Sequence, residues 1–228
     1  MRLLTDPVLR RRVAYLSRHG PRPQVPAQLD AVLLSHLHHD HLDLGSLRLL
    51  PREVRVLAPA GAGALLRKAG FREVEELVPG ESAEVGGLRI EATPAEHDDR
   101  RVGFRGRAVP VGFVARGDRP VYFAGDTDLF SGMEDLRPLD VALLPVAGWG
   151  PKLGPGHMNA ERAARAAHAL RPRIAVPIHW GTLHPRWHGP GPWFSDPPER
   201  FAAGVAELAP DVEVRVLAPG ESLELQAT

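Results

Sequence analysis

Four histidines and two aspartates crowd into the segment Ser35-His-Leu-His-His-Asp-His-Leu-Asp43. Imidazoles this close together would repel one another if charged, and would lack hydrogen-bond partners if neutral and buried. A metal ion removes both difficulties because it gives each ring nitrogen a partner. The segment directly follows the apolar run 31–34, so we predict a buried strand that ends in a metal site. A polar loop or tag-like tract is the alternative, but it does not account for the tight spacing.

The spacing of these residues suits two ions rather than one. Residues two apart just beyond a strand project from the same side of a loop, so His36 and His38 can bind one ion. Asp40 and His41 begin the next element and can face a second ion. Two ions about 3.5–4 Å apart would suit hydrolysis with a bridging hydroxide.

Composition limits the other chemistry open to the chain. The 228 residues include no cysteine, so histidine and carboxylate must hold any metal, which favours a catalytic over a closed structural site. The formal net charge is zero, which gives no reason to expect nucleic acid or an anionic membrane as a partner. Segment 1–16 has no signal-peptide pattern and no run is long enough to span a membrane, so we expect a cytoplasmic protein.

Short apolar runs alternate with helical patterns, which indicates an α/β layered domain. No linker is visible, and we expect one domain over residues 1–228. Helices are expected at 62–69, at 160–170 after the N-cap residue Asn159, and after Pro197-Pro198. Strands are predicted at 31–34, 54–57, 88–92, 111–115, 121–124, 141–146, 174–178, 212–217 and 223–225.

One stretch of sequence occurs twice. The letters of 53–59 return at 213–219, and Pro-Gly-Glu-Ser at 79–82 returns at 219–222. Two similar strand-and-turn pieces would explain this, because Pro-Gly is a common turn dipeptide. A fold with two related halves would explain it as well.

Three further strands run into metal-ligand residue types. The strand near Ile90 leads to His97, 121–124 runs into Asp126, and 174–178 runs into His179. Loops from neighbouring strands converge at strand ends, so these side chains are expected to join the first cluster.

Together these motifs resemble the metallo-β-lactamase superfamily. His36-x-His38-x-Asp40-His41 looks like its signature, and His97, Gly125-Asp126-Thr127 and His179 match its remaining motifs in order. The segments 4–7, 145–149, 157–159 and 177–182 resemble the branch that holds N-acyl-phosphatidylethanolamine phospholipase D-like and ascorbate-6-phosphate lactonase-like proteins. The resemblance implies a four-layer αβ/βα sandwich with pseudo-two-fold halves.

The resemblance also implies a ligand set. His36, His38 and His97 would hold one divalent ion, Asp40, His41 and His179 the other, and Asp126 would bridge them. Zinc is the first expectation, with manganese or iron possible. The predicted catalytic residues are Asp40 and His157, and His157 could protonate a leaving group or bind a phosphate oxygen.

The remaining tryptophans and histidines of interest lie outside the predicted ligand set. Trp149 and Trp180 are expected to wall the cleft or to pack beneath its loops. We expect His19, His39 and His168 to be surface or packing residues, and the sequence leaves His184 and His188 undecided.

The chain departs from the family pattern at two places. Relatives usually carry two strands before the stretch that matches Leu3 to Pro7, so we expect the sheet to lack its usual first strands or to be completed by association. Acidic residues, including Asp98 and Asp128, replace other residue types at the mouth, which disfavours a bulky anionic phospholipid.

These observations favour a hydrolase that acts on a phosphodiester or a phosphate-bearing ester, with a small-molecule or lipid-like substrate. The alternatives are a lactone or cyclic ester hydrolase, an iron-dependent redox enzyme on the same fold, and a catalytically silent metal-binding scaffold. A nuclease would need a basic, extended surface, and the net charge of zero argues against one. A homo-oligomer is possible.

Overall fold

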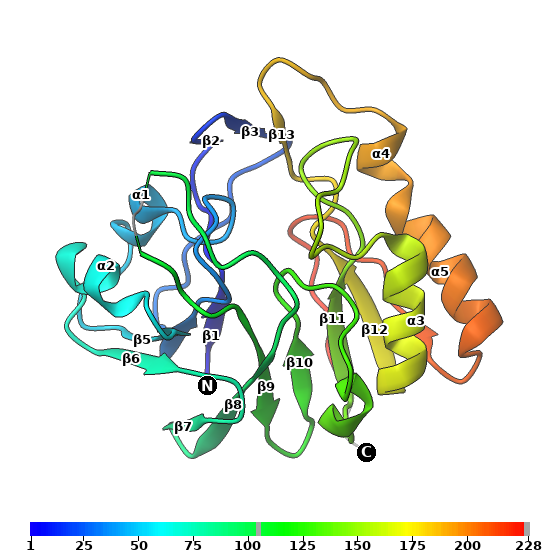
Figure 1. Cartoon of the computed structure of the whole chain (residues 1–228), viewed down its shortest axis with the longest axis horizontal. Coiled ribbons are helices and arrows are strands. Elements are labelled where there is room, and N and C mark those ends of the chain that lie inside the picture. The colour runs from blue at the N-terminus through cyan, green and yellow to red at the C-terminus, as the bar shows by residue number, and fades with distance from the viewer. Residues whose placement is uncertain (104–105, 226–228) are drawn as a thin grey trace.

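The computed structural model describes residues 1–103 and 106–225, and its strands form two main sheets that face each other (Figure 1). The four-stranded sheet is parallel throughout, in the order β1-β4-β5-β6, and the seven-stranded sheet is mixed, in the order β14-β12-β11-β10-β9-β8-β7. The first sheet contains β1 (Leu3–Thr5), β4 (Ala31–Leu33), β5 (Arg55–Pro59) and β6 (Val74–Leu77). The second contains β7 (Ser82–Val85), β8 (Leu88–Pro94), β9 (Val111–Arg116), β10 (Val121–Phe123), β11 (Val141–Pro145), β12 (Ile174–Ile178) and β14 (Glu213–Val214).

Helices cover the outer face of each sheet, which confirms the predicted four-layer αβ/βα sandwich. The helices α1 (Leu44–Leu47) and α2 (Gly63–Lys68) flank the first sheet, and α3 (Ala160–Leu170) and α5 (Pro197–Leu208) flank the second (Figure 1). Between the sheets lies a third apolar layer. The alternation of side chains along each strand produces these layers, because successive residues face opposite sides of a sheet.

A smaller antiparallel sheet stands above the two main ones, as Figure 1 shows. It joins β13 (Leu183–Pro185), β3 (Leu16–Arg18) and β2 (Arg12–Val13). The short helices η1 (Met133–Leu136) and α4 (Pro192–Ser195) complete the elements. None of these short pieces was predicted, because runs of two to four residues carry too little periodicity to be recognised.

The central strands and the longer helices match their predictions within about two residues. Asn159 caps α3, since its side chain accepts a hydrogen bond from the backbone N–H of Arg162 at 2.9 Å. Gly70, with φ 102°, ends the turn after α2. Both capping residues were recognisable from the sequence because their chemistry is local.

The predictions at the end of the chain were partly wrong. The strand expected at 212–217 is reduced to Glu213–Val214, and 223–225 is not a strand. Instead Leu217, Leu223 and Leu225 pack as irregular chain on the face of β11 and β12. Their apolar character reflects this burial rather than strand pairing.

The repeated sequence builds the same turn twice. Gly80 and Gly220 both have positive φ, at 92° and 99°. In each copy the glutamate that follows, Glu81 or Glu221, accepts a hydrogen bond from the backbone N–H three residues earlier, at 3.0 and 2.8 Å. The other repeated stretch differs in structure: residues 53–59 contain the whole of β5, whereas residues 213–219 contain only the short β14.

The facing sheets approach closely at the edge where β4 and β10 end. Gly125, which follows β10, has φ 61°, and a Cβ atom on it would lie 2.5 Å from the Cβ of Ser35. Only glycine fits this contact. The residues that follow the two strands are therefore brought side by side. Among the described residues, no helix has the length and apolar character needed to cross a membrane.

We expect Phe201→Ala to lower the free energy of unfolding by about 3–5 kcal/mol, because Phe201 on α5 is fully buried in the core shared with α3. Leu208→Ala on the same helix is the control. Leu208 is 40% exposed, so its loss should cost less than about 1 kcal/mol. Urea unfolding measures both, and equal losses would contradict this account of the α3–α5 core.

Candidate metal centre

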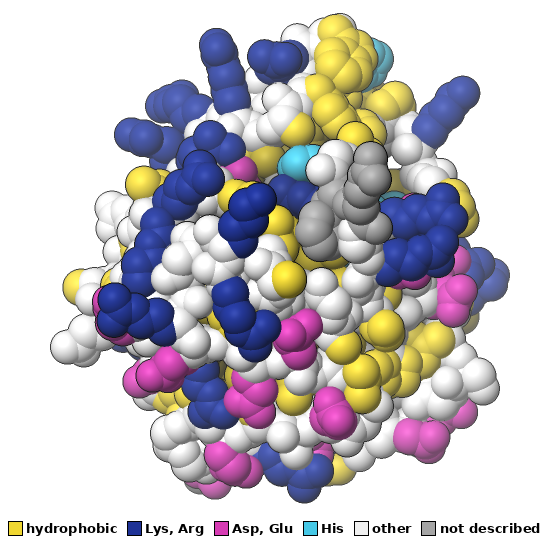
Figure 2. Space-filling model, turned by 60° about the vertical axis from the view of Figure 1, so that its left-hand side comes forward, with side chains coloured by type: hydrophobic (Ala, Val, Ile, Leu, Met, Phe, Trp, Pro, Cys, Tyr) yellow, Lys and Arg dark blue, Asp and Glu magenta, His cyan; other side chains and the backbone are white. Residues whose placement is uncertain are grey.

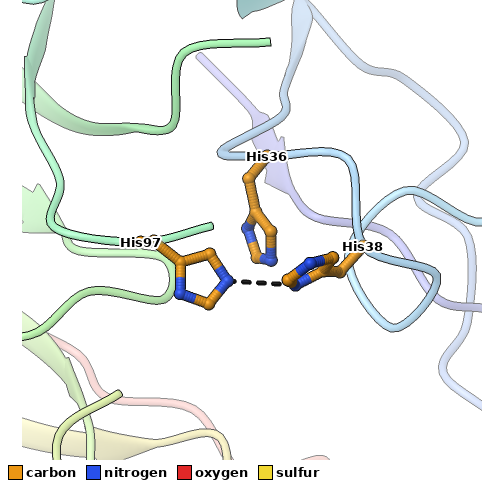
Figure 3. A group of neighbouring side chains, drawn as sticks. All are labelled: His36, His38 and His97. Carbon is orange, nitrogen blue, oxygen red and sulfur yellow. Dashed lines mark hydrogen bonds between the residues drawn. The ribbon is translucent and has the colours of Figure 1, made fainter. Parts of the chain in front are cut away.

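All seven predicted metal ligands lie together where β4, β8, β10 and β12 end. The first group comprises three imidazoles. His36 and His38 follow β4, His97 follows β8, and the candidate ligand atoms lie within 4.8 Å of one another. Figure 3 shows the three rings pointing toward a common point from two segments of the chain. His97 Nε2 lies 3.0 Å from His38 Nδ1.

The second group joins the two sheets. Asp40 and His41 come from the loop after β4, Asp126 follows β10, and His179 follows β12. Asp126 Oδ2 lies 3.1 Å from His41 Nε2 and 3.4 Å from His179 Nε2. Asp126 also belongs to a group with His97, so it is the carboxylate that stands between the two sets of donors.

The centre contains buried polar atoms that nothing in the protein satisfies. His36 Nε2 and Asp126 Oδ1 are buried without a hydrogen-bond partner. His41 Nε2 and His179 Nε2, both aimed inward, lie only 3.0 Å apart. Buried polar atoms normally have partners, and a cation would supply one to each of these. The donor set of imidazole nitrogen and carboxylate oxygen therefore fits divalent metal ions.

Hydrogen bonds from the far side of each ring fix the direction in which it offers its free nitrogen. His97 Nδ1–H donates to the carbonyl of Gly156 at 2.7 Å, and His179 Nδ1–H donates to that of Ala147 at 3.0 Å. Because a carbonyl can only accept, Nδ1 carries the proton in both rings and Nε2 faces the centre. Such outer contacts orient metal-binding histidines and set their tautomer.

Asp6 plays the same part for two further rings. His41 Nδ1–H donates to Asp6 Oδ2 at 2.7 Å, and Ser35 Oγ–H donates to the same oxygen at 2.5 Å. With its proton committed to Asp6, Ser35 Oγ accepts from His36 Nδ1–H at 2.9 Å. This chain leaves His36 Nε2 as a bare lone pair, and that atom is the unsatisfied one noted above.

The backbone is strained at two of these positions. Asp6 has φ 38° and His179 has φ 63°, a region that residues with a Cβ rarely adopt. Strain of this kind persists where the surroundings over-determine a conformation, which is common at functional sites. Asp6 belongs to the family-like segment 4–7, but no role was predicted for it from the sequence. In the structure it lies at the end of β1, the strand next to β4.

A buried arginine holds the loop that carries the first four predicted ligands. The guanidinium of Arg101 donates to the carbonyls of Leu37 and Leu42, the latter at 2.7 Å, and contacts His39 Nδ1 at 2.9 Å. Arg101 is 8% exposed. It follows His97 by four residues, so it ties the loop of one sheet to the loop of the other. Sequence reasoning missed this residue, since nothing local marks one arginine among many.

The electrostatics of the metal-free protein differ between the two groups. Burial lowers the pKa of His36 well below its ordinary value and that of His97 to about 4, so both rings are neutral in the metal-free protein. Burial also opposes charge on His41, but the carboxylates of Asp126 and Asp40 outweigh it and raise its pKa well above the ordinary value. Despite burial, His41 and His179 lower the pKa of Asp40 to about 2.

His157, the predicted proton donor, lies beside the centre. Its Nε2 is 3.5 Å from Asp126 Oδ2, and its ring centroid is 4.6 Å from that of His97. Its Nδ1 lies 3.1 Å from the carbonyl of Pro155 and 3.2 Å from that of Gly154, so Nε2 is the atom directed inward. His157 therefore stands within reach of a group bound between the two sets of donors.

A cavity of about 370 Å³ opens beside the second group. Asp40, His41 and His179 line it, as do Trp149 and Trp180. The other histidines lie outside the metal-ligand groups. His39 packs against Arg101, His168 Nδ1 contacts the carbonyl of Leu208, and His19 and His184 lie against Phe194.

Comparison with known proteins agrees with this picture. A family model described as "Beta-lactamase superfamily domain" matches residues 1–180. A UPF0173 metal-dependent hydrolase of Methanopyrus kandleri is 36% identical over 220 residues, which is 92% of this chain and 89% of that protein. A second, of Opitutus terrae, is 33% identical over 98% of this chain and 92% of its own.

Solved structures give the same result. A metallo hydrolase of Ignicoccus hospitalis superposes with a TM-score of 0.69 at 30% identity, covering 88% of this chain and 81% of that one. An isothiocyanate hydrolase from Delia radicum gut bacteria has a TM-score of 0.72 at 22% identity, covering 99% and 93%, and so shares the fold.

Asp6→Asn should weaken metal binding about 10- to 100-fold, because both oxygens of Asp6 accept hydrogen bonds, Oδ1 from the Ser35 backbone N–H and Oδ2 from His41 and Ser35 Oγ, whereas the NH2 group of an amide would face one of these donors. Competition with a chromogenic chelator measures the affinity. Asp30→Asn is the control, since Asp30 is exposed and accepts only from the backbone N–H of Arg2. Unchanged affinity in a folded Asp6→Asn protein would remove Asp6 from the support of the centre.

Metal binding should release protons at neutral pH, and the apparent affinity should rise with pH. The raised pKa of His41 means that its ring is protonated in the metal-free protein and must lose that proton to become a ligand. Calorimetric titration in buffers of different ionisation enthalpy measures the release. His41→Gln should reduce it, whereas His36→Gln should not, because His36 is already neutral. Equal release from both variants would contradict the assignment.

Proposed function

The chain belongs to the β-lactamase superfamily, among its UPF0173 metal-dependent hydrolases, and from that premise we propose that it cleaves a phosphodiester or phosphate-bearing ester at a centre of two divalent ions. The observation that carries this proposal is the pair of adjacent donor groups with Asp126 between them. One group alone would serve a single ion. Zinc is the first candidate, and manganese and iron suit the same donors.

In this proposal His36, His38 and His97 hold one ion, Asp40, His41 and His179 hold the other, and Asp126 reaches both. When bound, such ions supply Lewis acidity and lower the pKa of water, which provides a nucleophile at neutral pH. The residues keep the ligands in place. Asp6 and Ser35 orient His36 and His41, and Arg101 holds the loop between them.

The protein's own proton donor is His157 in this proposal. Its Nε2 faces Asp126, while Nδ1 is fixed against backbone carbonyls. A protonated Nε2 can donate to the oxygen of a leaving group as the ester bond breaks. Asp40 stays ionised because His41 and His179 hold its pKa at about 2, so in this proposal it offers a carboxylate that offsets part of the positive charge of the bound ions.

Surface charge supports an anionic substrate. The net charge is zero, yet Figure 2 shows Lys and Arg side chains gathered over the upper part of the face that carries α1 and α2, with acidic side chains below them. Arg12 of the small sheet and its flanking residues Arg11 and Arg186 are exposed as well. Clustered positive charge of this kind attracts anions to the protein surface.

The cavity favours a singly charged group over a doubly charged one. Arg18 lines it, but its guanidinium already donates to the carbonyls of Val8 and Arg10. A phosphate monoester held beside this apolar space would carry two negative charges, whereas a diester carries one. The same apolar lining supports the second candidate, hydrolysis of a lactone or other neutral cyclic ester, the chemistry of one group of proteins that the sequence resembles.

Purified protein loaded with zinc or manganese should hydrolyse bis(p-nitrophenyl) phosphate, and Asp126→Asn should lower kcat at least about 100-fold, because that carboxylate reaches both groups of donors. Asp30→Asn is the matched control on the surface. Colorimetric release of nitrophenol measures both.

The outcomes separate the candidates. Turnover of a phenyl-substituted lactone but not of the diester would replace the first candidate by the second. Absence of both activities in folded protein that contains two ions would contradict hydrolysis of these ester classes.

A further inference from the structure

We propose that the cavity beside Asp40, His41 and His179 is a binding site for the apolar arm of the substrate, a hydrocarbon or aryl group attached to the scissile ester. This inference rests on the proposed function, because only an enzyme has a substrate whose arm could occupy the cavity. Its apolar walls are formed by residues that the chemistry above does not use.

The cavity is continuous with one side of the metal centre. Its lining includes Asp40, His41 and His179, but not His36, His38 or His97. A group that reacts between the two sets of donors would therefore have one of its arms directed into this space. The other arm would lie toward His157, which does not line the cavity.

The walls of the cavity are apolar and come from several elements. Leu4 lies on β1, Phe123 on β10, Leu143 on β11 and Ile178 on β12. Leu143 and Ile178 border the apolar layer between the sheets yet stay partly exposed. Inward-facing leucine and isoleucine at the centre of a sheet are usually covered. Their exposure here marks a surface that an apolar ligand would bury.

Three polar side chains of the lining outside the metal centre are already bonded within the protein. Arg18 donates to two backbone carbonyls, and the Thr182 hydroxyl donates to the carbonyl of Trp180 at 3.0 Å. The Trp180 indole N–H donates to the carbonyl of Pro177 at 3.0 Å. A ligand arm that carried polar atoms would lose its hydration without finding free partners, so the space discriminates in favour of hydrocarbon.

The volume sets the size of the arm. A dry cavity of roughly 150 Å³ accommodates benzene. The present cavity measures about 370 Å³, more than twice that volume. It falls within the range of small-molecule sites, which are mostly apolar with a few polar groups at one end. A naphthyl or octyl group is of suitable size, whereas a methyl or ethyl ester would leave most of the cavity empty.

The test measures binding rather than turnover. Octanoate and butyrate have the same carboxylate and differ in apolar length, and isothermal titration of the metal-loaded protein compares them. Each buried methylene contributes about 0.8 kcal/mol, so octanoate should bind at least tenfold more tightly than butyrate. Leu143→Trp, which fills the cavity from β11, should reduce the preference to less than threefold, and Leu143→Phe should reduce it partly.

The control is Leu49→Trp. Leu49 is 58% exposed and does not line the cavity, so the preference for octanoate should persist. Circular dichroism establishes whether each variant is folded. If Leu143→Trp does not fold, Leu143→Phe provides the test in its place. Equal affinity of the wild type for the two acids, or a preference that survives both Leu143 substitutions, would overturn the proposal. If octanoate is preferred but no ester is hydrolysed, the cavity site stands and the proposed reaction fails.

Discussion

The arrangement of the loops at one edge of the two sheets depends on five imidazoles and two carboxylates that share one buried space. Left to themselves, these groups are poorly satisfied, as the short contact between His41 and His179 shows. The surrounding protein is arranged to tolerate that cost. Outward hydrogen bonds from His97, His179 and His41 fix the rings. Asp6, which accepts the bond from His41, has a strained backbone conformation. The result is a set of donors held in place before any ion arrives, which lowers the cost of ordering them on binding.

The sequence predicted the site better than the details that support it. His97, Asp126 and His179 were recognisable because each follows an apolar run, and parallel strands in facing sheets bring such ends together. Their roles as ligands remain predictions, while their proximity is observed. The roles of Asp6 and Arg101 were not predicted, because their partners lie 29 to 64 positions away along the chain and no local pattern indicates such contacts.

The layers of the fold were predictable from the sequence, whereas the last strand was not. Helix and strand periodicities depend on neighbouring residues, and the four layers follow from which faces are apolar. The terminal segment is apolar as well, but Leu217 and Leu223 pack without a neighbouring strand. Apolar sequence specifies burial, whereas strand formation also needs a partner with free hydrogen-bonding groups. The cavity beside the centre is a third case, since open space between two sheets has no signature in the letters that surround it.

The predicted ligands come from both sheets, and this has a consequence for the living cell. His36 and His41 follow a strand of one sheet, and Asp126 and His179 follow strands of the other. Ions bound there would act as a cross-link between the two halves and would stabilise the folded chain by mass action, by about 2.7 kcal/mol when the free ion is at a hundred times its dissociation constant. The abundance of the folded protein would then follow the supply of metal, and scarcity would expose the chain to proteolysis.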